Sequence, residues 1–66
     1  MYTSEEIITI TVKLKANEAF EFAQFLKRAS FSDWRSLAAN DDEAWVMQGA
    51  GYEIAKSLSD AGFNPR

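Results

Sequence analysis

The side chains of this 66-residue chain that could bind a metal or take part in catalysis are carboxylates, hydroxyls and a few basic groups, because it contains no His and no Cys. Without these two residue types it lacks the commonest zinc ligands and the usual base that activates a serine. Oxygen ligands remain, but Asp41-Asp42-Glu43 has neither the spacing nor the glycine of a calcium-binding loop. We therefore expect no metal site, no cofactor and no enzymatic activity.

A pair of glycines in Gly49-Ala50-Gly51 is a second pattern that could bind a ligand, because glycine-rich loops cradle phosphate groups. Such a loop follows a β-strand and opens a helix, whereas these residues lie inside a run with helical spacing. Close packing between helices, or a local bend, is the better interpretation.

The size and charge of the chain limit the kind of protein it can be. A domain this small buries only about 60% of its unfolded surface, and without disulfides or metals oligomerisation is the remaining way to compensate. A net charge of −3 is opposite to the basic surface expected of a nucleic-acid-binding protein. Residues 1–6 lack the features of a signal peptide, and no apolar run reaches the ~20 residues of a membrane span. These features predict a soluble cytoplasmic protein with no membrane partner.

The elements that must position a binding site begin with alternating apolar and polar side chains at residues 7–14, which predict a β-strand. No second strand follows, so we expect this strand to pair with the same strand of another copy. The predicted fold is α+β, with an N-terminal strand, three helices, and strand pairing in an intertwined homodimer. The predicted dimer interface is the apolar strand face, formed by Ile8, Ile10, Val12 and Leu14.

After the strand, apolar residues recur at steps of three and four, which is typical of helices that each bury one side. The chain has no internal repeat or linker, so these helices belong to a single domain covering residues 1–66. We predict helices at about residues 17–29, 32–39 and 41–61.

Capping residues mark the ends of the predicted helices. Asn17 and Asn40 suit the N-caps of the first and third helices, because an asparagine side chain accepts a hydrogen bond from a free backbone N–H. Gly62 suits the left-handed position after the third helix, where Phe63 would turn back toward Leu58.

Three aromatic residues, Phe20, Trp45 and Tyr52, fall outside the main apolar stripes of the first and third helices. Trp and Tyr are favoured anchors of protein interfaces, so we predict these three as partner-binding residues. The alternative is that a chain this small uses all of its aromatic residues in its own core.

A strand followed by helices in a short dimeric chain resembles the ribbon-helix-helix repressors over residues 7–29. In that family two N-terminal strands form a ribbon that enters the major groove of DNA. The resemblance implies DNA binding by the outward strand residues Thr9, Thr11 and Lys13. An ordinary exposed strand face would carry the same residue types.

Three further runs resemble an uncharacterised family of short bacterial proteins found on phages, plasmids and integrative elements. The resemblance implies a small regulator, or a stoichiometric inhibitor of a host defence system of the anti-CRISPR type. Its partner would be a bacterial protein or nucleoprotein complex in the host cytoplasm. The runs are Glu18-Ala19-Phe20-Glu21-Phe22-Ala23-Gln24-Phe25-Leu26-Lys27-Arg28, Glu43-Ala44-Trp45 and Ala61-Gly62-Phe63-Asn64-Pro65-Arg66.

From the sequence we therefore expect a non-enzymatic protein that binds another protein, with inhibition of a host defence complex as the preferred role. The alternative is a dimeric DNA-binding regulator that reads bases with Thr9, Thr11 and Lys13.

Overall fold

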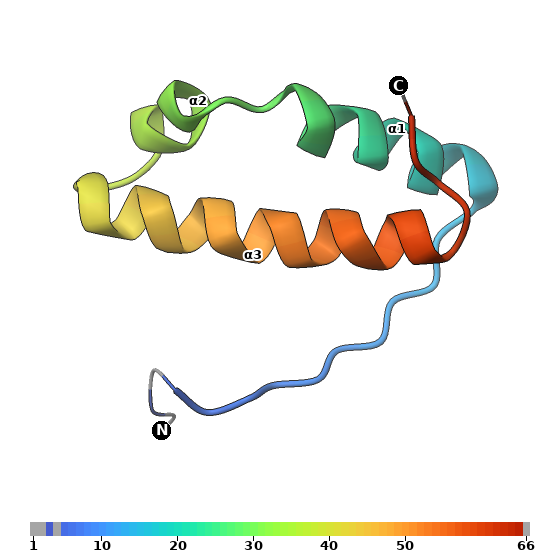
Figure 1. Cartoon of the computed structure of the whole chain (residues 1–66), viewed down its shortest axis with the longest axis horizontal. Coiled ribbons are helices and arrows are strands. Elements are labelled where there is room, and N and C mark those ends of the chain that lie inside the picture. Colours follow the sequence, from blue (N-terminus) through green and yellow to red (C-terminus); the bar gives the residue numbers. More distant parts are fainter. Residues whose placement is uncertain (1–2, 4, 66) are drawn as a thin grey trace.

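The computed structural model describes residue 3 and residues 5–65, and within them it contains three helices. Helix α1 spans Ala16–Arg28, α2 spans Phe31–Ser36 and α3 spans Asp41–Asp60. Helices α1 and α2 follow one another on one side of α3, and α1 runs in the opposite direction to α3 (Figure 1). The helical body therefore has two layers, with α3 as one layer and α1 and α2 as the other.

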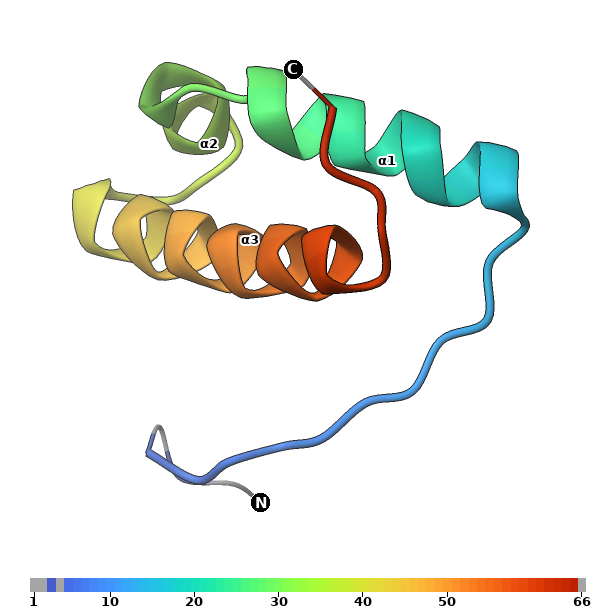
Figure 2. The ribbon, with the colours of Figure 1, turned by 45° about the vertical axis from the view of Figure 1, so that its right-hand side comes forward.

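The N-terminal segment at residues 5–15, which we call the arm, runs on the side of α3 that faces away from α1 and α2 (Figures 1 and 2). No β-strand occurs in residue 3 or residues 5–65, so the predicted α+β fold and the strand pairing built on it are wrong. The described chain is all-helical. Alternating side chains favour an extended backbone, but a strand also needs a neighbour that completes its hydrogen-bond ladder.

The helix at the arm's end begins one residue earlier than predicted, and it uses a different cap. Asn17 lies inside the first turn of α1 and is not the N-cap. The Glu18 carboxylate instead accepts a hydrogen bond from the backbone N–H of Lys15 at 2.9 Å. This acidic side chain also suits the positive end of the helix dipole.

The other two helix starts are capped by short-range side-chain contacts. At α2, the Asp33 carboxylate accepts hydrogen bonds from the backbone N–H of Ser30 at 2.8 Å and from its hydroxyl at 3.0 Å. At α3, the side-chain oxygen of Asn40 accepts the backbone N–H of Glu43 at 2.8 Å, which confirms the predicted cap.

The end of α3 also follows the sequence prediction. Gly62 has a φ of 100°, a conformation that glycine adopts without the steric cost of a Cβ atom. The backbone N–H of Phe63 donates to the carbonyl of Leu58 at 2.8 Å. The chain thereby turns back across α1 as a short C-terminal tail (Figure 2).

The apolar core between the layers is small. The buried apolar residues of the described chain are Ala19, Ala23 and Leu26 of α1 and Ala44 of α3, and no large side chain is completely buried. Small residues let α1 and α3 approach closely, but they bury little apolar area. Burial of apolar area therefore contributes little to the stability of the isolated chain.

Packing between α2 and α3 depends on one glycine. A Cβ atom at Gly51 would lie 2.9 Å and 3.0 Å from two ring carbons of Trp34, and 3.6 Å from a methyl carbon of Leu26. The indole of Trp34 therefore sits directly on the backbone of α3. This contact gives the second glycine of Gly49-Ala50-Gly51 the packing role expected from the sequence.

Candidate protein-binding surface

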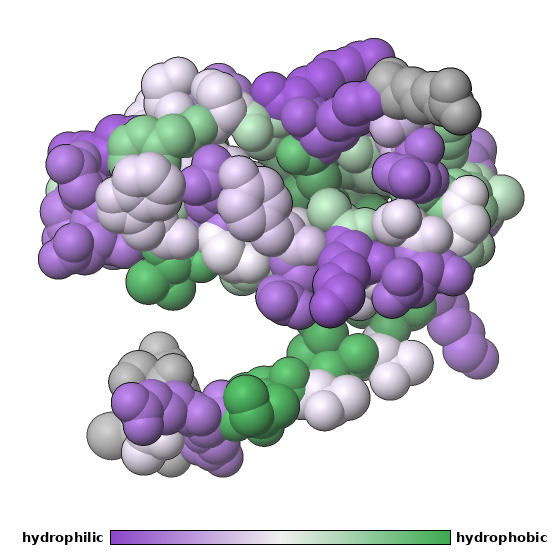
Figure 3. Space-filling model, viewed as in Figure 1, coloured by the Kyte–Doolittle hydropathy of each residue, from purple (hydrophilic) through white to green (hydrophobic). Residues whose placement is uncertain are grey.

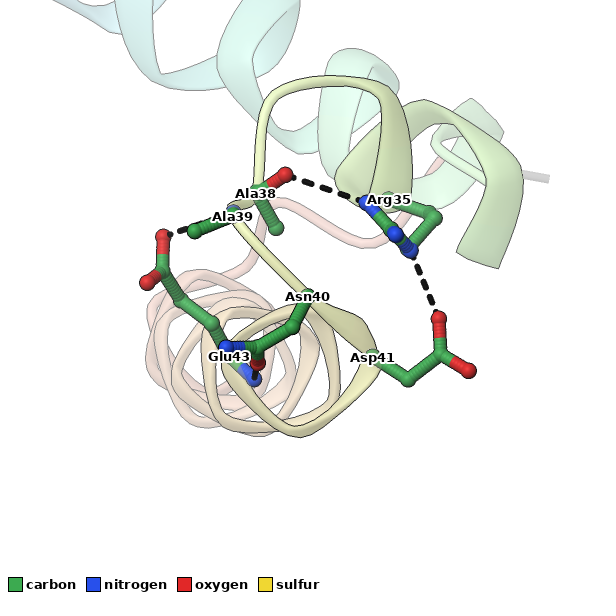
Figure 4. Close-up of polar contacts among 6 residues, drawn as sticks. All are labelled: Arg35, Ala38, Ala39, Asn40, Asp41 and Glu43. Carbon is green, nitrogen blue, oxygen red and sulfur yellow. Dashed lines mark hydrogen bonds and ion pairs between the residues drawn. The ribbon is translucent and has the colours of Figure 1, made fainter.

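The turn between α2 and α3 is held by polar contacts that fix where α3 begins (Figure 4). Arg35 Nε donates to Asp41 Oδ1 at 2.6 Å, and Arg35 Nη1 donates to the carbonyl of Ala38 at 3.1 Å. Glu43 Oε1 accepts the backbone N–H of Ala39 at 3.3 Å. The ion pair is exposed and adds little stability by itself, but these contacts together set the direction of the first turn of α3.

One turn after this start, Trp45 lies against Phe31 of α2. Their ring centroids are 4.2 Å apart and the rings are tilted by 32°. Trp45 nevertheless keeps 58% of its surface exposed. Contact with Phe31 restricts the indole on one side while the other side remains free to meet a partner.

Tyr52 lies on the same side of α3 as Trp45, because seven residues correspond to two helical turns and about 10 Å along the axis. Its side chain is 65% exposed. It borders a hollow of about 630 Å³ between α1, α3 and the C-terminal tail. The hollow is lined by Ala23, Leu26, Lys27, Ala29, Tyr52, Ala55, Phe63, Asn64 and Pro65.

The C-terminal tail is tied across this hollow by Lys27. The Nζ atom of Lys27 donates a hydrogen bond to the carbonyl of Pro65 at 2.8 Å. The exposed aromatic side chains on this side of α3 form a surface that borders the hollow at Tyr52. We call Phe31, Trp45 and Tyr52 the aromatic surface.

The structure does not place Phe20 on this surface. Phe20 is 43% exposed on α1 and is not among the residues that line the hollow. Two of the predicted partner-binding residues, Trp45 and Tyr52, thus share one side of a helix, and the third lies elsewhere.

A second aromatic group, which was not predicted from the sequence, lies on α1 and α2. Phe22 and Phe25 are stacked with centroids 5.7 Å apart and planes 12° apart. Phe25 also meets Trp34 edge-on at 6.4 Å. Such offset and edge contacts are favourable ring arrangements, and they connect α1 to the indole that packs on α3.

The arm residues are exposed on both sides. The predicted interface residues Ile8, Ile10, Val12 and Leu14 have 64%, 69%, 65% and 46% of their surface exposed. The predicted base-reading residues Thr9, Thr11 and Lys13 are exposed as well. Base reading as predicted required a ribbon of paired strands, which the described chain does not contain.

The Asp33 carboxylate at the start of α2 has a perturbed acidity. Its pKa lies below the ordinary value of 3.8, mainly because the backbone N–H of Ser30 donates to it and also because the Ser30 hydroxyl does. Both donors stabilise the ionised form. This shift follows from the role of Asp33 in capping α2.

Residue 3 and residues 5–65 contain neither a metal-binding cluster nor a membrane-spanning helix. No group of three or more His, Cys, Asp or Glu side chains is arranged there to hold a metal ion. No helix of that part of the chain has the length and apolar character needed to cross a membrane.

The fold and the surface define a small helical protein with an extended arm and exposed aromatic side chains. The chain belongs to the family of unknown function DUF7706, which matches residues 1–66. No curated protein matches it. No solved structure matches it either. The family match bears out the expected relation to an uncharacterised family and carries no link to mobile elements or to ribbon-helix-helix repressors.

Proposed function

We propose that this protein binds another protein through the aromatic surface and catalyses no reaction. The observation that carries this proposal is the pair Trp45 and Tyr52, which lie on one side of α3 with 58% and 65% of their surfaces exposed. Large aromatic side chains with few rotatable bonds bury much area at little entropic cost, and they dominate the energetics of many interfaces.

The geometry around Trp45 supports its role as an anchor. Contact with Phe31 at 4.2 Å restricts the indole before binding, so less conformational freedom is lost when a partner covers it. The hollow beside Tyr52 is apolar along most of its lining and can accept a partner side chain.

Charges near the aromatic surface indicate the chemistry of the partner. Asp41 and Asp42 stand exposed in the first turn of α3, one turn before Trp45. A complementary partner would present apolar side chains flanked by basic groups at this end. Arg35 already pairs with Asp41, so Asp42 is the freer acceptor for such a group.

We further propose that the partner belongs to a bacterial host and that binding inhibits a defence complex in its cytoplasm. Support for this finer step is the resemblance of residues 18–28, 43–45 and 61–66 to short proteins of mobile elements. A stoichiometric inhibitor needs a binding surface and no active site, which is compatible with the aromatic surface.

The test is a pull-down from bacterial lysate that compares wild-type protein with a double variant, Trp45→Ala and Tyr52→Ala. We expect a protein retained by the wild type to be lost with the double variant. Phe20→Ala is the matched control, because it removes an exposed aromatic ring outside the aromatic surface and should leave retention unchanged. Retention of no protein by the wild type, or equal retention by the double variant, would contradict the proposal.

DNA binding is distinguished in the same experiment. Material that nuclease treatment releases would favour the DNA-binding alternative and count against the proposal. So would retardation of a DNA duplex in a gel that Lys13→Ala weakens and added salt abolishes.

A further inference from the structure

The isolated chain exposes far more surface than a compact protein of its size. Its solvent-accessible surface is 5750 Å² for a mass of 7.4 kDa. A compact monomer of this mass exposes about 4,200 Å², so the excess is roughly 1,500 Å². An excess of this size is comparable to what each chain buries in an obligate dimer, which is roughly 1,000–2,500 Å².

The arm contributes exposed apolar side chains to this large surface. Ile7 is 88% exposed, and the four apolar residues that follow at alternate positions from Ile8 are 46–69% exposed. Figure 3 shows these apolar side chains along the arm, with open space between its outer half and the helical body. Burying one such side chain contributes about 1.5–3 kcal/mol, so leaving five of them in water forgoes a large stabilisation.

A second uncovered apolar feature runs along α3. Val46, Ala50 and Ile54 recur at four-residue steps, which places them in one line on the helix surface. Val46 is 73% exposed, Ile54 is 38% exposed, and Ala50 is exposed as well. We call these three residues the α3 line.

We propose that a second copy of this chain covers both the arm and the α3 line. One chain supplies both surfaces, so a two-fold arrangement lets each copy cover the apolar residues of the other at the same time. The arm projects from the body at α1 and is separated from it over its outer half, so it can reach a neighbouring molecule (Figures 1 and 3).

Charge complementarity supports a second copy as the occupant. The arm begins with Glu5 and Glu6 and ends with Lys13 and Lys15. A two-fold axis perpendicular to the arms reverses the direction of one arm relative to the other. The acidic end of each arm then lies near the basic end of its partner's arm, which is favourable for exposed charges at low salt.

This inference goes beyond the proposed function, because it uses the arm and the α3 line instead of the aromatic surface. It is tested by measuring the mass of the purified full chain by sedimentation equilibrium. We expect twice the chain mass for the wild type at concentrations near 100 µM and dissociation on dilution, as mass action requires. A chain-sized mass at that concentration would overturn the proposal.

Two matched double variants each place two negative charges on one side of the arm. Ile10→Asp with Val12→Asp should weaken dimerisation by about 100-fold or more, because two carboxylates would have to be buried in an apolar contact. Thr9→Asp with Thr11→Asp adds the same charge on the other side and should weaken it much less. Equal weakening by both variants would contradict the predicted contact side.

Amide hydrogen exchange keeps the test independent of whether a variant folds. Backbone amides of residues 7–14 in the wild type should exchange more slowly at high concentration than on dilution, because a second copy would shield the arm from solvent. A dimer with unprotected arm amides would show another interface, and a monomer with protected ones would show the arm folded onto its own chain. Either result would overturn the proposal. Trp45→Ala should leave the dimer mass unchanged, which separates this test from that of the aromatic surface.

Discussion

The arm and the helical body differ in how far their polar and apolar groups find partners within the chain. In the body, each helix start has a carboxylate or amide acceptor within three residues, as Glu18, Asp33 and Asn40 show. In the arm, five large apolar side chains stand 46–88% exposed. A helix forms its hydrogen bonds between residues that are close along the chain. An extended segment needs hydrogen-bond partners and apolar contacts from another segment or another molecule.

The largest expected effect contrasts one buried residue of the body with one exposed residue of the arm. Leu26→Ala should lower the free energy of unfolding by about 2–4 kcal/mol, because it leaves a cavity in a small core. Leu26 is 8% exposed, against 65% for Val12. Urea unfolding at several protein concentrations measures the effects of Leu26→Ala and of Val12→Ala.

Protein concentration separates the two effects, because only the dimer depends on it. The loss caused by Leu26→Ala should be present at every concentration, whereas Val12→Ala should matter only where dimers form. If Val12→Ala destabilises the dilute monomer as much as Leu26→Ala does, Val12 packs against the helices of its own chain. That result would contradict the contrast between arm and body.

A smaller effect is expected from the two glycines of α3. Gly51→Ala should destabilise the protein by about 1–3 kcal/mol, because the new methyl group would meet the Trp34 ring within 3.0 Å. Gly49→Ala meets nothing within 4 Å and should stabilise the helix by about 0.5–1 kcal/mol. Thermal and urea unfolding of both variants checks the opposite signs. A stabilising Gly51→Ala would show that Trp34 moves aside freely.

The smallest expected effect is the pH dependence of the α2 cap. The pKa of Asp33 is lowered in the folded state, so its contribution to stability is complete above the ordinary value of 3.8 and is lost as the pH falls through the lower folded value. Asp33→Asn should therefore lie closer to the wild type in stability at low pH than at neutral pH. Urea unfolding at both pH values measures this.

Ser30→Ala sharpens this pH experiment. It removes the hydroxyl donor but keeps the backbone N–H, which is the larger cause of the shift. An NMR titration of the Asp33 carboxyl should show a pKa that rises toward 3.8 without reaching it. No change in that pKa would contradict the role of the hydroxyl.

The helix positions could be predicted because their signals are local. The three predicted ranges differ from the observed helices by at most three residues at either end. Asn40 and Gly62 act as predicted because the hydrogen bonds at both helix ends join residues no more than five apart along the chain. Asn17 was wrong because Glu18 reaches back to Lys15, and this competing cap starts α1 earlier.

The predicted strand and much of the surface depend on contacts between distant residues. The period of two at residues 7–14 predicted which side chains would share a strand face, but it did not supply the missing strand partner. Helical spacing placed Trp45 and Tyr52 on one side of α3. The contact of Trp45 with Phe31 joins residues on two different helices, and no periodicity within one helix reveals it.

The contact between Trp34 and Gly51 gives this small chain a built-in optical probe. The chain has two tryptophans: Trp34 is half-buried against α3, and Trp45 is largely exposed. In a Trp45→Phe variant, fluorescence would come from Trp34 alone and would follow the separation of α2 from α3. In a Trp34→Phe variant, emission from Trp45 would respond when another molecule covers the indole. The shielded Trp34 should emit at a shorter wavelength than the exposed Trp45, and the two single-tryptophan variants would report folding and binding separately.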